Sequence, residues 1–438
     1  MVSLLGIILS IALIIVLAFK KVPLYVYAPL CAAIAALFSK LNPYEVLTTF
    51  FTQGIGSYVS QNFMLFLSSA VFAAFMCESG ASKYIALRIS SLAQRSRNSQ
   101  FAGLMYMALV QFVLTAGGVN VFVIIFLLVD LNRTMYEELD IPWNLYLANM
   151  WASSTATTWA LPGMPSIQNL IPTTYLGTTP MAGAGLGIFM GVEISVLCIG
   201  YVWLCLRRAK RNGQHFLPEG AAVAAKDIQV EKDPTDGIRL LPALMPPVVV
   251  LIAMNAFKVA PAISLVLGSV VAWALFHKHI RRFTVTFGKG MESGLSVLLP
   301  VAFMAGYGQV IASTEGFGLA IEALKHIPGP EVLQVFIAAN VASCICGSVS
   351  GGLGIVLTTL GDYFLSMNLS PGIIHRIVLA GASGLDTMPH AASIHSLMRV
   401  SCIEFNWNSY THLFVCNLVL TIITGLTGVL LVSLGVFT

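Results

Sequence analysis

Two ionisable side chains, Asp386 and His390, stand in an apolar stretch where a membrane segment would normally hold aliphatic residues. They lie on either side of Pro389 in the run GLDTMPHAAS, residues 384–393. An ionisable group inside a bilayer costs about 2.5–3.5 kcal/mol on insertion scales, and such groups usually mark ion or proton pathways. Either group could carry a coupling proton, because histidine titrates near neutral pH and a buried aspartate can do so. The alternative is structural: the aspartate caps a half-helix and the histidine bonds to a carbonyl.

Hydroxyl side chains gather beside helix-breaking residues in several places. Two are the glycine-containing stretches TAGGVN (115–120) and SVSGGLG (348–354), and the others precede Pro162 and Pro389. A single hydroxyl in a membrane helix usually bonds to its own backbone, but repeated clusters beside Gly or Pro favour a binding site. We therefore expect substrate contacts from Thr115, Gly117, Gly118, Asn120, Ser153, Ser154, Thr155, Thr157, Ser348, Ser350, Gly351, Gly352, Ser383 and Thr387.

The two glycine-containing stretches suit the tips of re-entrant hairpins. Irregular backbone deep in a membrane is tolerated only where it lines a cavity or is buried in protein. Helix N-termini at such tips point N–H groups and positive dipole ends toward the cavity, where they can bind a carboxylate. Carbonyl and hydroxyl oxygens of the unwound segments could bind a cation such as Na⁺, so proton and sodium coupling both stay open.

The composition indicates which class of protein positions these groups. Of the 438 residues, 57% are hydrophobic and 10% are charged, whereas a soluble domain has about 25% charged residues. Apolar residues do not alternate along the chain, so helices rather than a barrel must satisfy the backbone in lipid. We predict an all-α polytopic membrane protein. The basic residues are spread over loops, so we expect the lipid bilayer and not nucleic acid as a partner.

Apolar stretches long enough to span a membrane recur along the chain. The first, residues 2–19, is too long for a signal-peptide core and has no cleavage site, so we predict a first spanning helix. The others lie at about 22–38, 62–77, 142–160, 181–206, 239–257, 259–276, 290–312, 371–385 and 409–435. We expect Arg376, near the start of one stretch, at the membrane interface. The glycine run at 183–191 is typical of small-residue helix packing.

The hydrophilic stretch 207–238 separates two halves with matching features. It begins RRAKRNGQH, which predicts a cytoplasmic linker. AFKKVP precedes it and AFKVAP follows it, each between two apolar helices, and aligning Pro162 with Pro389 pairs Ser166 with Ser393. We infer a duplication of residues 1–206 onto 239–438.

The distribution of basic residues places the first helices of the two halves in opposite directions, so the predicted repeats are inverted. Inverted repeats with broken helices are typical of secondary transporters. Each half would supply scaffold helices (about 1–100 and 239–330) and a transport part (about 101–206 and 331–438). The first half has Trp159 and Gly163 at the positions of Asp386 and His390. We therefore assign ion coupling to the unshared pair and substrate binding to the shared hydroxyls.

Two stretches carry a family resemblance. SSTATTWALPGMPSIQNLIPTTYLGTTPMAG (153–183) and ASGLDTMPHAASIHSL (382–397) resemble signature regions of the gluconate permease family. The second is similar to its 3-hydroxybutyrate-permease-like branch, in which a GLDT-hydrophobic-PH sequence occurs. The resemblance spans most of the chain. That family belongs to the ion transporter superfamily, so the resemblance implies an elevator-type carrier with two re-entrant hairpins and two unwound helices.

The resemblance further implies proton-coupled uptake of a small hydroxy-carboxylate or sugar acid by a homodimer in the inner, cytoplasmic membrane. Few polar side chains beyond Ser and Thr are present for a polyol chain, which favours a shorter acid. We expect no catalytic residue, no metal and no cofactor beyond the coupling ion, H⁺ or possibly Na⁺. A sodium-coupled carboxylate carrier is the alternative function. An intramembrane hydrolase is a remote one, because no GxSxG elbow accompanies the Ser and His residues.

Overall fold

The computed structural model describes residues 2–20, 22–116, 119, 121–164, 166–225, 237–257, 259–280, 282–324 and 328–437. Helices make up 80% of the structure, and strands do not occur in these ranges. Within them, six helical runs are long and apolar enough to cross a membrane. The prediction of an all-α polytopic membrane protein is confirmed.

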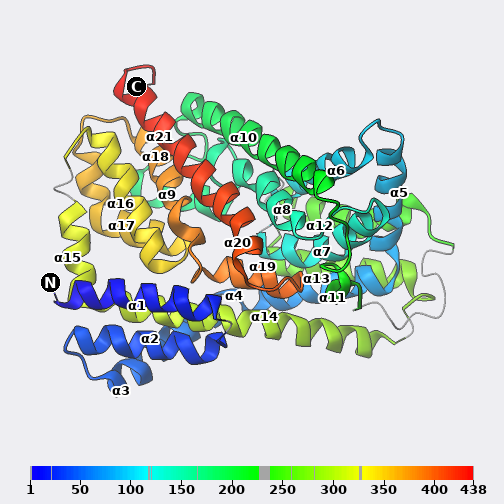
Figure 1. The fold of residues 1–438 in the computed structure, drawn as a ribbon, viewed down its shortest axis with the longest axis horizontal. Helices are drawn as coiled ribbons and strands as arrows, with labels where there is room; N and C mark the ends of the chain where they lie inside the picture. The colour runs from blue at the N-terminus through cyan, green and yellow to red at the C-terminus, as the bar shows by residue number, and fades with distance from the viewer. Residues whose placement is uncertain are drawn as a thin grey trace.

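The first half contains ten helices in its described part (Figure 1). They are α1 (Val2–Phe19), α2 (Leu24–Phe38), α3 (Pro43–Val46), α4 (Thr52–Glu78), α5 (Ala81–Gln94), α6 (Ser99–Ala116), α7 (Val121–Glu138), α8 (Leu145–Thr155), α9 (Ile167–Leu176) and α10 (Ala184–Arg211). Two π-helical turns continue them: η1 (Leu47–Phe51) joins α3 to α4, and η2 (Ala156–Ala160) extends α8.

The second half follows the short α11 (Ala221–Ala224). Its elements are α12 (Leu240–Asn255), α13 (Pro261–Phe276), α14 (Phe283–Ala312), α15 (Glu315–Leu324), α16 (Glu331–Cys346), α17 (Val349–Leu365), α18 (Pro371–Ala382), the 3₁₀ turn η4 (Leu385–Thr387), α19 (Ala392–Val400), α20 (Trp407–Leu413), the π-helical turn η5 (Phe414–Val419) and α21 (Leu420–Ser433). These bounds agree with most of the predicted spans. The helix predicted at 290–312 begins seven residues earlier, because Lys289 and the threonines and glycine of the preceding stretch 283–288 lower its hydropathy.

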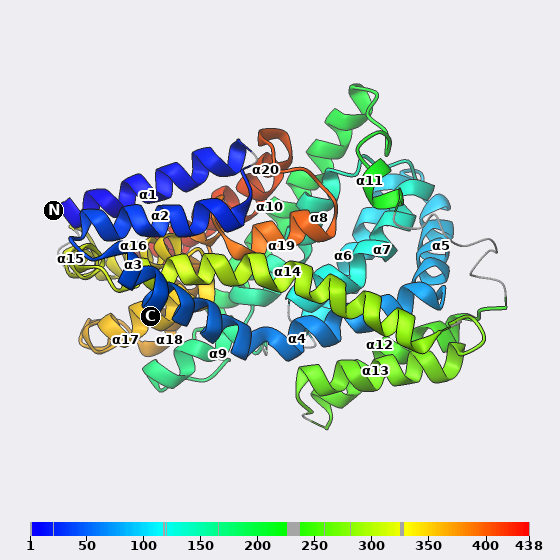
Figure 2. The same cartoon turned by 90° about the horizontal axis from the view of Figure 1, so that it is seen from below.

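The long helices α4 and α14 form an antiparallel central pair. Gly54 packs against Gly306 near one end, and Gly290 packs against Val71 near the other. A Cβ added to Gly306 would lie 2.8 Å from the Phe51 carbonyl oxygen, so glycine is required for this close approach. Figure 2 shows α1 and α2 beside one end of this pair and α12 and α13 beside the other. The central pair therefore connects the helix pair that begins the first half with the helix pair that begins the second half.

The α16–α17 hairpin turns at Gly347, which has a φ of +59°. Ser348 then caps α17, because its hydroxyl accepts a hydrogen bond from the Gly351 backbone N–H at 3.4 Å. The stretch 348–354, predicted to form a hairpin tip, thus begins directly after the turn, and Gly351 and Gly352 lie in the first turn of α17. Gly352 allows close packing within the hairpin: a Cβ there would lie 2.1 Å from Ser343 Oγ.

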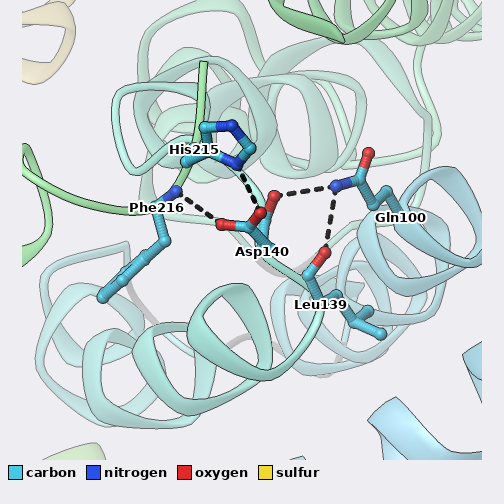
Figure 3. A network of polar contacts seen from close by, with 5 residues as sticks. All are labelled: Gln100, Leu139, Asp140, His215 and Phe216. Carbon is cyan, nitrogen blue, oxygen red and sulfur yellow. Dashed lines mark hydrogen bonds and ion pairs between the residues drawn. The ribbon is translucent and has the colours of Figure 1, made fainter. Parts of the chain in front are cut away.

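The start of the predicted linker is folded onto the corner between α7 and α8 (Figure 3). Asp140 accepts hydrogen bonds from the Phe216 backbone N–H at 3.0 Å and pairs with His215 Nδ1 at 2.6 Å. The His215 imidazole, followed by the Phe216 N–H, holds the pKa of the Asp140 carboxyl below its usual value. Gln100 Nε2 donates to the carbonyls of Leu139 and Asp140. Residues near 215 thus belong to the first half rather than to a free tether.

Candidate substrate and ion site

The first broken helix unwinds after Ala160. Leu161 is extended, with φ −68° and ψ 133°, and Gly163 has a φ of +75°. Pro162 has no backbone N–H to continue the helical ladder. The chain becomes helical again at α9, where the Ser166 hydroxyl accepts from the Asn169 N–H at 3.2 Å and donates to the Thr158 carbonyl at 2.7 Å. Ser166 therefore closes the break by joining its two sides.

The hydroxyl cluster before this break is bonded to its own backbone. Ser153, Ser154, Thr155 and Thr158 donate to carbonyls three or four residues earlier. Thr157 also reaches another element, because its hydroxyl lies 2.7 Å from Thr115 Oγ1 at the end of α6. Both residues are predicted substrate contacts, and the structure places their side chains in contact with each other. Gly117, Gly118 and Asn120, predicted at the adjoining hairpin tip, lie outside the described residues.

The second broken helix contains Asp386. α18 ends at Ala382, and the chain passes through η4 before α19 begins at Ala392. Asp386 is 7% exposed, and its Oδ1 has no hydrogen-bond partner among the described residues. The buried Ser383 hydroxyl is unpartnered in the same way, while the Thr387 hydroxyl donates weakly to the Gly384 carbonyl at 3.4 Å. Each unpaired buried group costs about 1–3 kcal/mol unless a ligand, an ion or a water supplies the partner.

His390 connects this broken segment to the α16–α17 hairpin. Its Nε2 lies 2.7 Å from the carbonyl oxygen of Cys344, near the end of α16. A carbonyl only accepts hydrogen bonds, so Nε2 carries the proton and Nδ1 is the acceptor nitrogen. Nδ1 is buried without a partner in the described structure. The carbonyl contact is the one foreseen in the structural interpretation of His390, and the second nitrogen leaves the proton-carrying interpretation open.

Other side chains of the second half complete this region, and the sequence reading missed them. Tyr410 donates to the Thr387 carbonyl at 2.9 Å. Asn340 Oδ1, which is buried without a partner, lies 2.5 Å from the position that a Cβ of Gly384 would take. Asn340 lies in the middle of α16, and a lone amide in an apolar helix is the signal that would have identified it.

Arg376 is fully buried, and its predicted place at the membrane interface is wrong. Its Nε donates to the Ala182 carbonyl at 2.6 Å and its Nη2 to the Pro180 carbonyl at 2.5 Å. Its Nη1 lies 3.5 Å from each of the last two carbonyls of η2. The guanidinium thus satisfies carbonyls that the first broken helix and the loop before α10 leave without helical partners.

The glycines near the start of α10 make room for this arginine. A Cβ on Gly183 would lie 2.7 Å from Arg376 Cγ, and one on Gly187 would lie 3.1 Å from its Cδ. The prediction that this glycine run serves close packing is confirmed. Arg376 is buried because of these long-range contacts, and the sequence of α18 alone cannot predict them.

The neighbouring His375 holds the same part of the first half. Its Nδ1 lies 2.8 Å from Thr178 Oγ1, and its Nε2 lies 3.0 Å from Asn169 Oδ1. The Asn169 amide in turn donates to the Met164 carbonyl at 2.8 Å, inside the first break. Through these contacts α18 positions the broken helix of the other half. The sequence signal for this role is the pair of adjacent ionisable residues in the apolar run IIHRIVLAGA.

The comparisons with known proteins agree with a membrane transporter. No family model matches the chain. It is 26% identical to a protein of Bacillus subtilis (strain 168) named uncharacterized transporter YxjC, over 95% of this chain and 96% of that protein. It is 25% identical to a protein of Haemophilus influenzae (strain ATCC 51907 / DSM 11121 / KW20 / Rd) named uncharacterized transporter, over 76% of each. The chain is thus a multi-pass helical membrane protein similar to proteins that are named transporters, in line with the expectation that it is not an enzyme.

Proposed function

We propose that the protein is a secondary transporter that carries a small hydroxy-carboxylate or sugar acid together with a proton across the cytoplasmic membrane. The observation that carries this proposal is Asp386, a buried carboxyl in a broken membrane helix with one oxygen that has no partner among the described residues. The names of the two relatives support transport as the general activity.

The order of elements supports an inverted-repeat carrier. Each half has a helix pair, a long central helix, a short helix, a second helix pair, a broken helix and a long final helix. We assign α1–α5 and α12–α15 to a scaffold, and α6–α10 and α16–α21 to a moving transport part. A homodimer held together by its scaffolds is part of the same proposal and follows from the family resemblance.

The substrate carboxylate fits best at the N-terminus of α17. Ser348 and Ser350 lie there, and the first-turn N–H groups carry the positive end of the helix dipole. The Thr115–Thr157 pair and Thr387 would face the remainder of a hydroxy acid. Asp386 would hold the coupling proton, and Arg376 would keep the first broken helix in shape without touching the substrate.

Asp386→Asn tests the coupling role, because it keeps the shape of the side chain and removes its charge. We expect this variant in proteoliposomes to lose accumulation driven by a pH gradient while it still exchanges internal for external substrate. Radiolabelled 3-hydroxybutyrate, lactate and gluconate are the probes. Full accumulation by Asp386→Asn would exclude Asp386 as the coupling group.

Sodium coupling is the second candidate, and one observation favours it. Asn340 Oδ1 is a buried acceptor, Asp386 Oδ1 is one when its carboxyl is ionised, and both lack a hydrogen-bond partner in the described structure. Oxygen ligands of this kind suit hard cations. Uptake measured at one fixed pH, with Na⁺ or with choline in its place, separates the two ions. If uptake depends on Na⁺ and not on the pH gradient, Na⁺ takes the place of the proton as the coupling ion in this proposal.

A further inference from the structure

The last turns of α10 line a cavity of about 900 Å³ with four basic side chains. The described lining residues are Leu204, Arg207, Arg208, Lys210, Arg211 and Asn212. All four basic residues are exposed, and none of them forms an ion pair in the described structure. None of the described lining residues is acidic, so the cavity presents positive charge to an anion.

A second segment adds basic residues at the same end of α10. The Lys210 ammonium donates to Asn98 Oδ1 at 2.9 Å, which joins the loop between α5 and α6 to the last turn of α10. Arg95 and Arg97 lie within three residues of Asn98, and both are exposed. They add to the charge of the four basic residues of α10. This concentration of Lys and Arg predicts the cytoplasmic side of the membrane for this end of the helix.

An aromatic ring orients the guanidinium of Arg207. The Cζ atom of Arg207 lies 4.1 Å from the centroid of the Trp203 ring, one turn earlier on α10. The face of a tryptophan ring attracts a cation, so the guanidinium has a preferred position above it. Tryptophan is enriched where the hydrocarbon of a bilayer meets the headgroups. The Trp203–Arg207 pair therefore marks that depth, with the basic end of α10 on the headgroup side.

An exposed apolar track leads along α10 to this basic end. Figure 1 shows α10 at the outer edge of the molecule. Val192, Val196 and Ile199 are 58%, 63% and 41% exposed. At 3.6 residues per turn, these three residues and Trp203 lie within about 60° of one another around the helix, and Arg207 continues the same face. From Val196 to Arg207 the helix rises about 16 Å, which matches the hydrocarbon depth of one leaflet, about 15 Å.

The basic end and the apolar track together fit one kind of molecule, an anionic phospholipid. Its phosphate suits guanidinium groups, which can bind two phosphate oxygens through parallel N–H bonds. Its acyl chain suits the exposed track. Basic pockets at the cytoplasmic ends of membrane helices bind acidic headgroups in this way. A free phosphate would make no contact with the track, and a zwitterionic headgroup would bring its own ammonium toward the arginines.

We propose that the end of α10 is a binding site for a phospholipid of the cytoplasmic leaflet that has a net negative headgroup. Its phosphate contacts Arg207 and Arg211, which are neighbours one turn apart on the helix surface. Its glycerol lies beside Trp203, and an acyl chain follows the track toward Val196 and Val192. The site does not depend on what the protein carries, so the proposal stands or falls separately from the proposed function.

Arg207→Gln combined with Arg211→Gln tests the site, because it removes two positive charges and keeps a polar side chain at each position. Native mass spectrometry of the purified protein counts bound lipid during titration with dioleoylphosphatidylglycerol or dioleoylphosphatidylcholine. We expect the wild type to bind phosphatidylglycerol more strongly than phosphatidylcholine. The double variant should bind phosphatidylglycerol about thirtyfold more weakly, which corresponds to about 1 kcal/mol for each basic residue near an anionic surface.

Lys278→Gln combined with Arg282→Gln is the matched control. Both residues are exposed and lie between the end of α13 and the start of α14, so this variant loses the same charge at another basic helix end. We expect it to bind phosphatidylglycerol as strongly as the wild type does. Wild-type affinity in R207Q/R211Q overturns the proposal. Equal losses in the two double variants, or equal binding of the two lipids by the wild type, also overturn it.

Trp203 gives a second measurement that leaves the charges in place. A phospholipid with brominated acyl chains quenches the fluorescence of a tryptophan that it contacts. We expect brominated phosphatidylglycerol to quench the wild type more than brominated phosphatidylcholine does, and this difference to disappear in Trp203→Phe. Trp273→Phe, which removes a 41% exposed tryptophan of α13, should keep the difference. A difference that persists in Trp203→Phe places the lipid elsewhere and overturns the proposal.

Inorganic phosphate separates a lipid from a free anion as the occupant. The track contributes to binding of a lipid and not of phosphate, so inorganic phosphate at the concentration of the lipid should not displace phosphatidylglycerol from the wild type. Displacement under these conditions would assign the basic end of α10 to a soluble phosphate compound, and the lipid proposal would be wrong.

Discussion

Arg376 and Asp386 are both buried charges beside broken helices, but their surroundings differ. Arg376 bonds to four backbone carbonyls, so its donors are satisfied by the protein itself. Asp386 has an oxygen that nothing in the described structure satisfies. A satisfied group is suited to positioning, and an unsatisfied one to binding something that comes and goes. At the scale of single residues this difference separates a positioning residue from the proposed coupling residue.

Arg376→Met is expected to destabilise the protein more than any change at an exposed arginine. It removes the guanidinium donors from these carbonyls, and each carbonyl left unsatisfied costs about 1–3 kcal/mol. The Pro180 carbonyl is the exception, because it still accepts from the Gly163 N–H at 2.9 Å and from the Asn169 amide at 3.2 Å. Arg376→Lys should recover part of the loss, because an ammonium cannot reproduce the planar array of donors. Thermal unfolding in detergent measures both variants. Arg399→Met, at an exposed arginine near the end of α19, is the control, and an equal loss in both would show that the four carbonyl contacts contribute nothing.

At the scale of elements, hydropathy predicts the positions of most helices but not the residue at which each one breaks. The spans predicted at 2–19 and 259–276 match α1 and α13 closely, because uniform apolar runs must be helical in lipid. The sequence predicts a hairpin tip in the stretch 348–354, and the turn lies just before it at Gly347, with Gly351 and Gly352 in the first turn of α17. Several nearby glycines look equivalent in a sequence, and only the packing partner shows which one turns the chain and which one allows close contact.

Gly352→Ala and Gly354→Ala form a matched pair on α17. A Cβ at Gly352 would meet Ser343 Oγ at 2.1 Å, whereas a Cβ at Gly354 would meet nothing within 4 Å. We expect Gly352→Ala to open the hairpin, at a cost of at least about 1–3 kcal/mol, and to stop transport. Gly354→Ala should be neutral or stabilise the helix by about 0.5–1 kcal/mol. Substrate uptake and the unfolding temperature are measured for both variants. Equal values for the two would contradict the role of Gly352 in close packing of the hairpin.

At the scale of the whole molecule, the order of elements in both halves was predictable, and the contacts between the halves were not. Matching motifs on either side of the linker predict a duplication from the sequence. The pairing of α18 with the first broken helix joins residues about two hundred positions apart, such as His375 and Asn169. No periodicity within one helix encodes such a contact. The prediction of Arg376 at the membrane interface failed for this reason. Asp386 and His390 stand out in the sequence because an ionisable residue in an apolar run is a local signal, and their role in ion coupling stays a prediction.

The proposed movement of the transport part against the scaffold makes a prediction about two aromatic contacts of equal length. Phe19 and Phe405 join the proposed scaffold to the proposed transport part, and Tyr25 and Phe303 join two scaffold helices; both pairs have ring centroids 5.1 Å apart. In a background without native cysteines, a short thiol-specific cross-linker across F19C/F405C should stop uptake, and reduction should restore it. Cross-linked Y25C/F303C should transport normally, because its two helices keep their relative position. Unchanged uptake after complete cross-linking of F19C/F405C would show that the two parts do not move against each other at this contact.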